Sequence, residues 1–291
     1  PKVYNVLKAG HDLWHQLNPT EQERILWQRS QRVKQIEEAV QKQEKGIGSP
    51  FLFFNASAQL KYLNFNAAVE FLTAWGLRLG GQRVHYVLCE GGIKKCIVGT
   101  HVQNLNFPPP CHTCITHNTV FYPTHLTTHI PKDLPPCVES SHLASLSFDE
   151  LIAFEYQGFK MGEICLPSAR WLLRCHDLER IERGKQLYIQ YITACVSLIP
   201  YFKQLIEKHR PQGVIVFNGT FYPEATLREV SNQYDIPVYS HEVGFSPLSA
   251  FFSKGVATAH HVEIPSTFQM GTRENAKLDA YMEQRVQGNF T

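Results

Sequence analysis

Two short apolar segments between residues 213 and 244 each end abruptly in polar side chains that could do chemistry. The polar residues at these two ends are Asn218, Gly219, Thr220, His241 and Glu242. An imidazole or a carboxylate can take a proton from a hydroxyl nucleophile, and an amide can orient that hydroxyl. We therefore predict His241 and Glu242 as candidate general bases, with Asn218 orienting the substrate.

The elements expected to position these residues are two strands and a helix. The segments 213–218 and 237–242 are apolar and bounded by glycine or proline, which is typical of parallel strands that are covered on both faces. An amphipathic helix at about 223–234 connects them. Such a unit brings the carboxyl ends of its strands to one edge of a sheet, where ligands bind in open α/β sheets. The sequence thus predicts a crevice at this edge.

Each of these features also has a structural explanation, which the sequence leaves open. Asn218 and Gly219 could form a turn, because both residue types tolerate a left-handed backbone. His241 and Glu242 could form an ion pair at a surface turn. In the functional alternative, Gly219 lets the backbone approach a ligand, and Glu224 lies at the start of a helix whose N-terminus favours anions.

Another strand–helix–strand unit is predicted nearer the N-terminus, with strands at 50–55 and 83–89 and a helix at about 59–79. Together the two units predict an α/β fold, in which a Rossmann-like open parallel sheet is covered by helices on both faces. A long helical segment is also expected over 176–209, interrupted at Pro200.

The chain divides by composition into three parts. They are an N-terminal helical segment (1–48), the α/β domain (49–268) and a helical tail (269–291) that is expected to lead into a further domain outside this sequence. The α/β domain carries a loop insertion rich in Cys, Pro and His at about 89–147. The helix at 20–46 has a capping box and one thin apolar stripe, so it is expected to pack along one side; docking to a partner protein or a membrane surface is the alternative.

Four cysteines are spaced C-x6-C-x14-C-x2-C, at Cys89, Cys96, Cys111 and Cys114. The second pair can reach one ion from a tight turn, and the first pair would complete a tetrahedral zinc site or the corners of an iron–sulfur cluster. We expect zinc in a structural role, fixing the loop beside the strand ends. Alternatively, Cys89 is a small apolar residue at a strand end, or the second pair is a redox site, which normally lies at a helix N-terminus and not in a proline-rich loop.

Composition excludes several classes of function. The 28 Lys and Arg nearly balance the 26 Asp and Glu, so charge alone does not predict a nucleic-acid partner. No apolar run approaches the roughly 18 residues of a membrane span, and the first residues lack a signal-peptide core. We expect a cytoplasmic protein, with a peripheral position at the inner face of the membrane as an alternative. The absence of Gly-x-Gly-x-x-Gly, Walker and Gly-x-Ser-x-Gly motifs disfavours dinucleotide oxidoreductases, P-loop enzymes and α/β-hydrolases.

The stretch VIVFNGTFYPEATLREVSNQYDIPVYSHEVGF resembles a pattern in bacterial surface-carbohydrate glycosyltransferases of the two-domain GT-B type, which include capsule-polysaccharide biosynthesis proteins. Their N-terminal domains carry a strand that ends in Asn-Gly, a helix, and a strand that ends in Glu-x-Gly. Thr220 stands where that pattern often has Arg. The matching residues are Asn218, Gly219, Asp235, Ile236, Pro237, Val238, Glu242 and Gly244.

The resemblance implies an acceptor-side domain, which binds a polysaccharide, glycolipid or protein hydroxyl. A C-terminal domain outside this sequence would bind the nucleotide-sugar donor, so this polypeptide alone would have little or no transferase activity. His241 or Glu242 would be the base. A metal-stabilised, non-catalytic interaction module is the alternative function, and an iron–sulfur redox protein is the third. The expected substrate-binding residues are Asn218, Gly219, Thr220, Glu224 and Gly244.

Overall fold

The computed structural model describes residues 20–57, 63–244, 246–260 and 262–287. They form two compact units: a larger one that ends at His260 and a smaller one that follows it. The predicted boundary, after position 268, lies a few residues further along the chain. Each unit is described by itself below.

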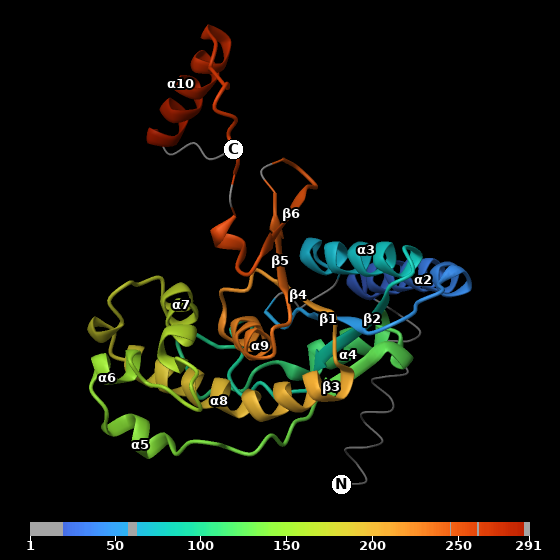
Figure 1. Cartoon of the computed structure of the whole chain (residues 1–291). Helices are drawn as coiled ribbons and strands as arrows, with labels where there is room; N and C mark the ends of the chain where they lie inside the picture. Colours follow the sequence, from blue (N-terminus) through green and yellow to red (C-terminus); the bar gives the residue numbers. More distant parts are fainter. Residues whose placement is uncertain (1–19, 58–62, 245, 261, 288–291) are drawn as a thin grey trace. The chain divides into compact units, whose positions relative to one another are not determined.

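In the described residues of the larger unit, six strands form one sheet in the order β3-β2-β1-β4-β5-β6 (Figure 1). Neighbouring strands from β3 to β5 are parallel, and the edge strand β6 is antiparallel to β5. The predicted Rossmann-like α/β sheet is therefore confirmed. The strands are β1 (Pro50–Phe54), β2 (Arg83–Cys89), β3 (Thr127–Ile130), β4 (Gly213–Phe217), β5 (Val238–Val243) and β6 (Ala250–Lys254).

Helices pack on both faces of this sheet. Along β1, Leu52 and Phe54 belong to the core that includes α7, α8 and α9, whereas Phe53 belongs to the core beneath α2, α3 and α4. This alternation is the two-residue period of a strand that is buried on both sides. The helices are α2 (Glu21–Gln43), α3 (Phe65–Leu79), α4 (Cys111–Phe121), α5 (Ser140–Ser145), α6 (Phe148–Ile152), α7 (Met161–Leu173), α8 (Gly184–His209) and α9 (Tyr222–Gln233).

The strand order reverses direction between β1 and β4, and this reversal fixes where a ligand can enter. The chain moves from β1 to β2 through α3, and in the opposite direction from β4 to β5 through α9. Because parallel crossovers are right-handed, the two connecting helices lie on opposite faces. The carboxyl ends of β1 and β4 then border the switch point, which is the usual ligand crevice of this fold.

Two expectations are not confirmed. The region 89–147 is not a continuous loop: it contains α4, β3 and α5, and Cys111 begins α4. These elements are short, and only His117, Asn118 and Phe121 of α4 are buried, so no apolar period marks that helix. The expected interruption at Pro200 was also wrong, because α8 runs through it. Burial of α8 against the sheet and α9 outweighs the missing backbone donor.

A buried ion network fixes α2 to α3. Arg78 on α3 is 1% exposed and contacts the carboxylates of Glu37 at 2.6 Å and Glu44 at 2.5 Å, both on α2 or its C-terminal cap. The Trp75 indole also donates to Glu37. The predicted capping box of Thr20 is confirmed at the start of α2. The other side of α2 exposes Trp27, so docking of a partner protein through this helix stays a prediction.

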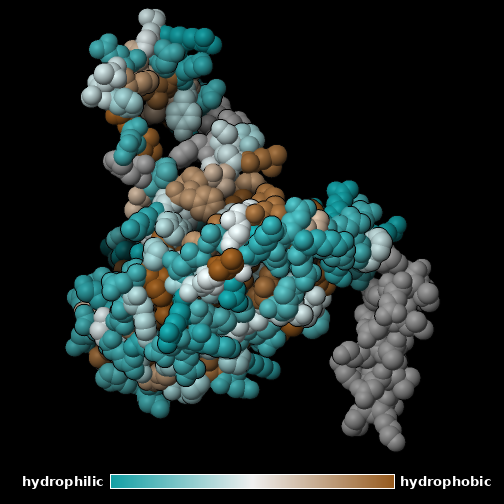
Figure 2. Space-filling model, turned by 45° about the vertical axis from the view of Figure 1, so that its right-hand side comes forward, coloured by the Kyte–Doolittle hydropathy of each residue, from teal (hydrophilic) through white to brown (hydrophobic). Residues whose placement is uncertain are grey.

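The smaller unit contains α10 (Thr272–Val286), whose described residues are all exposed, among them Leu278, Tyr281 and Met282. On the face of the larger unit seen in Figure 2, hydrophilic side chains predominate, as expected where apolar residues are packed inside. Among the described residues, no helix has the length and apolar character needed to cross a membrane.

Replacing Arg78 by Met should lower the free energy of unfolding by about 3 kcal/mol, because the carboxylates of Glu37 and Glu44 would stay partly buried without their counter-ion. Urea denaturation measures the change. The matched control is Arg180→Met, which breaks an exposed ion pair with Asp177 and should change stability by no more than about 0.5 kcal/mol. Equal effects of the two substitutions would contradict the anchoring role of Arg78.

Candidate functional site

The ends of β4 and β5 lie together, as the sequence predicted. The Asn218 amide nitrogen donates to the Glu242 carboxylate at 2.6 Å, and the Asn218 backbone N–H donates to the His241 carbonyl at 2.9 Å. The second oxygen of Glu242 accepts the backbone N–H of Val243 at 2.8 Å. Glu242 is only partly buried. The pair is thus a carboxylate held in one orientation by two N–H donors and still open to solvent.

The turn after β4 combines both explanations that the sequence left open. Asn218 and Gly219 have left-handed φ values of 58° and 73°, and the Asn218 side-chain oxygen accepts the Thr220 N–H at 3.1 Å. A Cβ atom at Gly219 would lie 2.4 Å from the Ser240 hydroxyl oxygen, so this position requires glycine. The Asn218 oxygen is therefore used in the turn, while its nitrogen orients Glu242.

His241 is buried and lies on a different face of the sheet from the adjacent Glu242. Successive side chains of a strand point to opposite faces, so His241 lies on the other side of the sheet from Glu242. It is 1% exposed, between the rings of Phe217 and Phe252, whose centroids are 5.7 and 6.0 Å away. Burial lowers the pKa of His241 to about 4. A neutral ring without solvent access does not suit a base that must meet a substrate hydroxyl, so the geometry favours Glu242 over His241.

Glu224 lies in the first turn of α9, at the switch point. It is fully buried, and its carboxyl group accepts the backbone N–H and the hydroxyl of Ser57, which follows β1, at 2.7 and 2.8 Å. Burial raises the pKa of Glu224 to about 7, and the hydrogen bonds of Ser57 oppose that rise. Glu224 therefore holds the chain that leaves β1, and a contact between Glu224 and a substrate stays a prediction.

A second buried carboxyl group, that of Glu70 on α3, was not among the predicted site residues. It is 2% exposed, accepts the Asn55 amide at 2.7 Å and contacts the Tyr122 hydroxyl at 3.4 Å. Burial raises the pKa of Glu70 to about 7, and the charge of Glu224 adds to the rise. An acidic residue within the apolar stripe of the predicted helix 59–79, three positions after Ala67, was the available signal.

Three buried oxygen atoms around the switch point have no hydrogen-bond partner among the described residues. They are the side-chain oxygens of Asn55, at the end of β1, and of Thr220, after β4, and the second carboxyl oxygen of Glu224. A buried polar atom without a partner is costly unless a ligand or water satisfies it. Gly244, by contrast, donates its N–H to the Ser249 carbonyl at 2.7 Å and closes the hairpin between β5 and β6.

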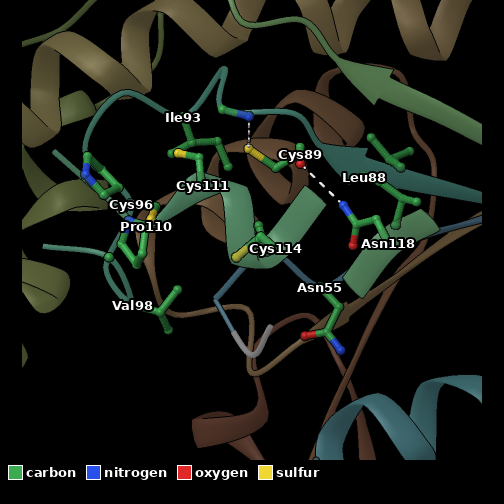
Figure 3. Close-up of a pocket in the computed structure, with 15 residues that line it drawn as sticks. Asn55, Leu88, Cys89, Ile93, Cys96, Val98, Pro110, Cys111, Cys114 and Asn118 are labelled. Atoms are coloured by element: carbon green, nitrogen blue, oxygen red, sulfur yellow. Dashed lines mark hydrogen bonds between the residues drawn. The ribbon is translucent and has the colours of Figure 1, made fainter. Parts of the chain in front are cut away.

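The four predicted cysteine ligands gather around one small cavity (Figure 3). Cys89 ends β2, Cys96 lies in the connection that follows, and Cys111 and Cys114 lie in the first turn of α4. Burial raises the pKa of the Cys96 thiol to about 12 and that of Cys114 to about 11. The second pair is thus at a helix N-terminus, which removes one argument against a redox pair, although a raised pKa disfavours a reactive thiolate.

Comparisons with protein-family models, with curated proteins and with solved structures find no match to this chain. The functional assignment therefore depends on the geometry described above and on the resemblance of the stretch 214–245.

The two buried carboxyl groups predict a distinctive pH dependence of stability. Unfolded Glu ionises near pH 4.5 and folded Glu70 and Glu224 near 7, so the folded state binds more protons between these values. Their contribution to the free energy of unfolding is complete below about pH 4.5 and is lost as the pH rises to about 7. The loss is at most about 3 kcal/mol for each group.

Urea denaturation at pH 5 and pH 8 tests this prediction with Glu70→Gln. The neutral amide cannot ionise, so the variant should gain stability relative to the wild type as the pH rises. The titration of His241 is common to both proteins and cancels in the difference. Glu182→Gln, at an exposed position, is the matched control and should show no such gain. A difference between Glu70→Gln and wild type that is equal at both pH values would show that Glu70 is not held protonated.

Proposed function

We propose that this chain is the acceptor-side domain of a GT-B type glycosyltransferase. In this proposal it holds a hydroxyl group of a polysaccharide, glycolipid or protein while a sugar is transferred from a nucleotide-sugar donor. The observation that carries the proposal is the Asn218–Glu242 pair, which lies at the carboxyl edge of a doubly wound parallel sheet. That edge is where this class of fold binds its ligands.

Glu242 is the proposed general base. Its carboxylate would take the proton of the acceptor hydroxyl as that oxygen attacks the anomeric carbon, and the bond from this carbon to the nucleoside diphosphate would break. The hydrogen bonds from Asn218 and Val243 fix the carboxylate before substrate arrives. Orientation of this kind removes part of the entropic barrier to proton transfer.

The buried polar groups at the switch point support a ligand rich in hydroxyl groups. The oxygens of Asn55 and Thr220 lack partners among the described residues, and a saccharide offers many hydroxyl donors. The buried Glu70 accepts the Asn55 amide and the buried Glu224 accepts the Ser57 N–H, so both would position the chain that leaves β1. The nucleotide sugar would be bound by a second Rossmann-like domain, as the resemblance implies. A glycolipid acceptor would place the protein at a membrane surface.

A non-catalytic, metal-stabilised interaction module is the second candidate function. The specific observation in its favour is the gathering of four cysteines around one cavity, which would give a domain a rigid scaffold without any catalytic group. The two candidates differ in what Glu242 does. It is needed for turnover in the first and is dispensable in the second.

Sugar transfer by the natural full-length polypeptide tests the proposal, with radiolabelled nucleotide sugars and a panel of oligosaccharide and glycolipid acceptors. Glu242→Gln should lower kcat by at least about 100-fold, because the amide cannot accept the proton, with a smaller effect on the acceptor KM. Glu182→Gln, an exposed and conservative change, is the control and should be as active as wild type. Unchanged turnover in Glu242→Gln would refute the base assignment, and saccharide binding without any transfer would favour the interaction module.

A further inference from the structure

The cysteine cavity is lined by three segments of the chain: Asn55 and Ala56 after β1, the stretch from the end of β2 to Gly99, and the stretch from Pro109 into α4. The four cysteines come from the last two segments. Figure 3 shows the four sulfur atoms around one space at the start of this helix. The cavity measures about 30 Å³, and most of its lining is apolar. Four thiols thus line one space, and Cys111 and Cys114 have the two-residue spacing that is typical of zinc ligands.

Backbone N–H groups point at the sulfur atoms of Cys89 and Cys96. Cys89 accepts the N–H of Gly91 at 3.3 Å, with further backbone N–H contacts from Gly92 and Ile93, and Cys96 accepts the N–H of Gly99. Such N–H donors are the outer shell expected around a metal-bound cysteine.

The segment that enters α4 offers a comparable environment. Cys111 and Cys114 occupy the first turn of α4, where backbone N–H groups carry partial positive charge. No acidic residue lies in that turn, and Pro110 at the N-cap makes no side-chain hydrogen bond to it. In this turn, the Cys111 and Thr113 N–H groups donate to the carbonyls of Pro109 and Pro110.

A tight fold of the backbone brings these groups together. A Cβ atom at Gly99 would lie 2.8 Å from the Cys96 sulfur and 2.7 Å from the Pro109 side chain, so only glycine lets the two segments approach. Gly91 has a φ of 90°, which other residues rarely adopt.

We propose that Cys89, Cys96, Cys111 and Cys114 bind a single zinc ion. As they stand, no three His, Cys, Asp or Glu side chains of the described residues converge closely enough to hold a metal. Zinc binding would therefore bring the sulfur atoms closer together, and rotation about the Cα–Cβ bond moves the sulfur atom of a cysteine between staggered positions. Four thiolate ligands suit tetrahedral zinc, and a cavity with room for about one or two water molecules suits one ion and not a multi-atom cluster.

The ion supplies an anchor that the apolar core does not. Of the three buried residues of α4, only Phe121 is apolar, and a helix of 11 residues is marginal without tertiary packing. Zinc would fasten the N-terminal turn of α4 to the end of β2, where Asn118 already donates to the Cys89 carbonyl at 3.2 Å. Asn55 lies beside both the cysteine cavity and the switch point, but zinc content and sugar transfer are measured separately, so either proposal can fail alone.

Metal analysis of the chain purified under reducing conditions tests the site. Mass spectrometry of the elements should find one zinc per chain in the wild type and in Cys137→Ser, which changes a half-buried cysteine outside the cavity. The double variant Cys111→Ser/Cys114→Ser should lose the zinc. Because that variant could fail to fold, the wild type is also exchanged with Co²⁺, which should give the intense visible absorption of a tetrahedral thiolate complex. Removal of zinc by a chelator should lower the midpoint of thermal unfolding by several degrees.

Four outcomes would overturn the proposal. They are wild-type protein without stoichiometric zinc and with no thermal shift when zinc is added, a brown iron-containing product, a disulfide among the four cysteines in freshly purified protein, and Co²⁺ spectra that lack thiolate bands. None of these results depends on sugar transfer, and loss of transfer in Glu242→Gln does not depend on the metal.

Discussion

The reversal of strand order between β1 and β4 is the constraint on which the rest of the molecule depends. It sends α3 and α9 to opposite faces of the sheet and leaves the ends of the two central strands uncovered by either crossover. Polar residues follow both strands at this point: Asn55 after β1 and Asn218 after β4. A sheet that is buried on both faces can expose polar side chains only at its edges and at the ends of its strands. The candidate site accordingly lies at the carboxyl ends of β1 and β4.

Three glutamates around this point show how environment separates their roles. Glu70 and Glu224 are buried, with pKa values raised to about 7, and they hold Asn55 and Ser57 through short hydrogen bonds. Glu242 is partly exposed and is held by N–H donors only. Glu70 and Glu224 are buried and favour the neutral form, so they can hold neighbouring groups in place. Glu242 is an accessible carboxylate, so it can accept a proton from a substrate.

Much of the sheet could be predicted from the sequence, because strands buried on both faces are short apolar runs bounded by glycine or proline. The approach of Asn218 to Glu242 followed from the parallel crossover. The two-residue period of a strand also predicts that His241 and Glu242 lie on opposite faces of the sheet, although both were predicted as candidate bases of one site. α4 could not be predicted, since its packing depends on contacts with β2 and not on an apolar stripe. Asn55 and Glu70 interact over 15 residues of sequence, and only the folded chain brings them together.

Hydrogen–deuterium exchange of this chain, with and without an acceptor oligosaccharide that it binds, tests the central claim most directly. We expect that binding protects the backbone around 218–224 and 242–244, together with the end of β1, and that Asn218→Ala weakens this protection. Protection confined to the groove between Lys160 and Gln233, on the outer side of α7 and α9, would contradict the assignment of the switch point as the acceptor site.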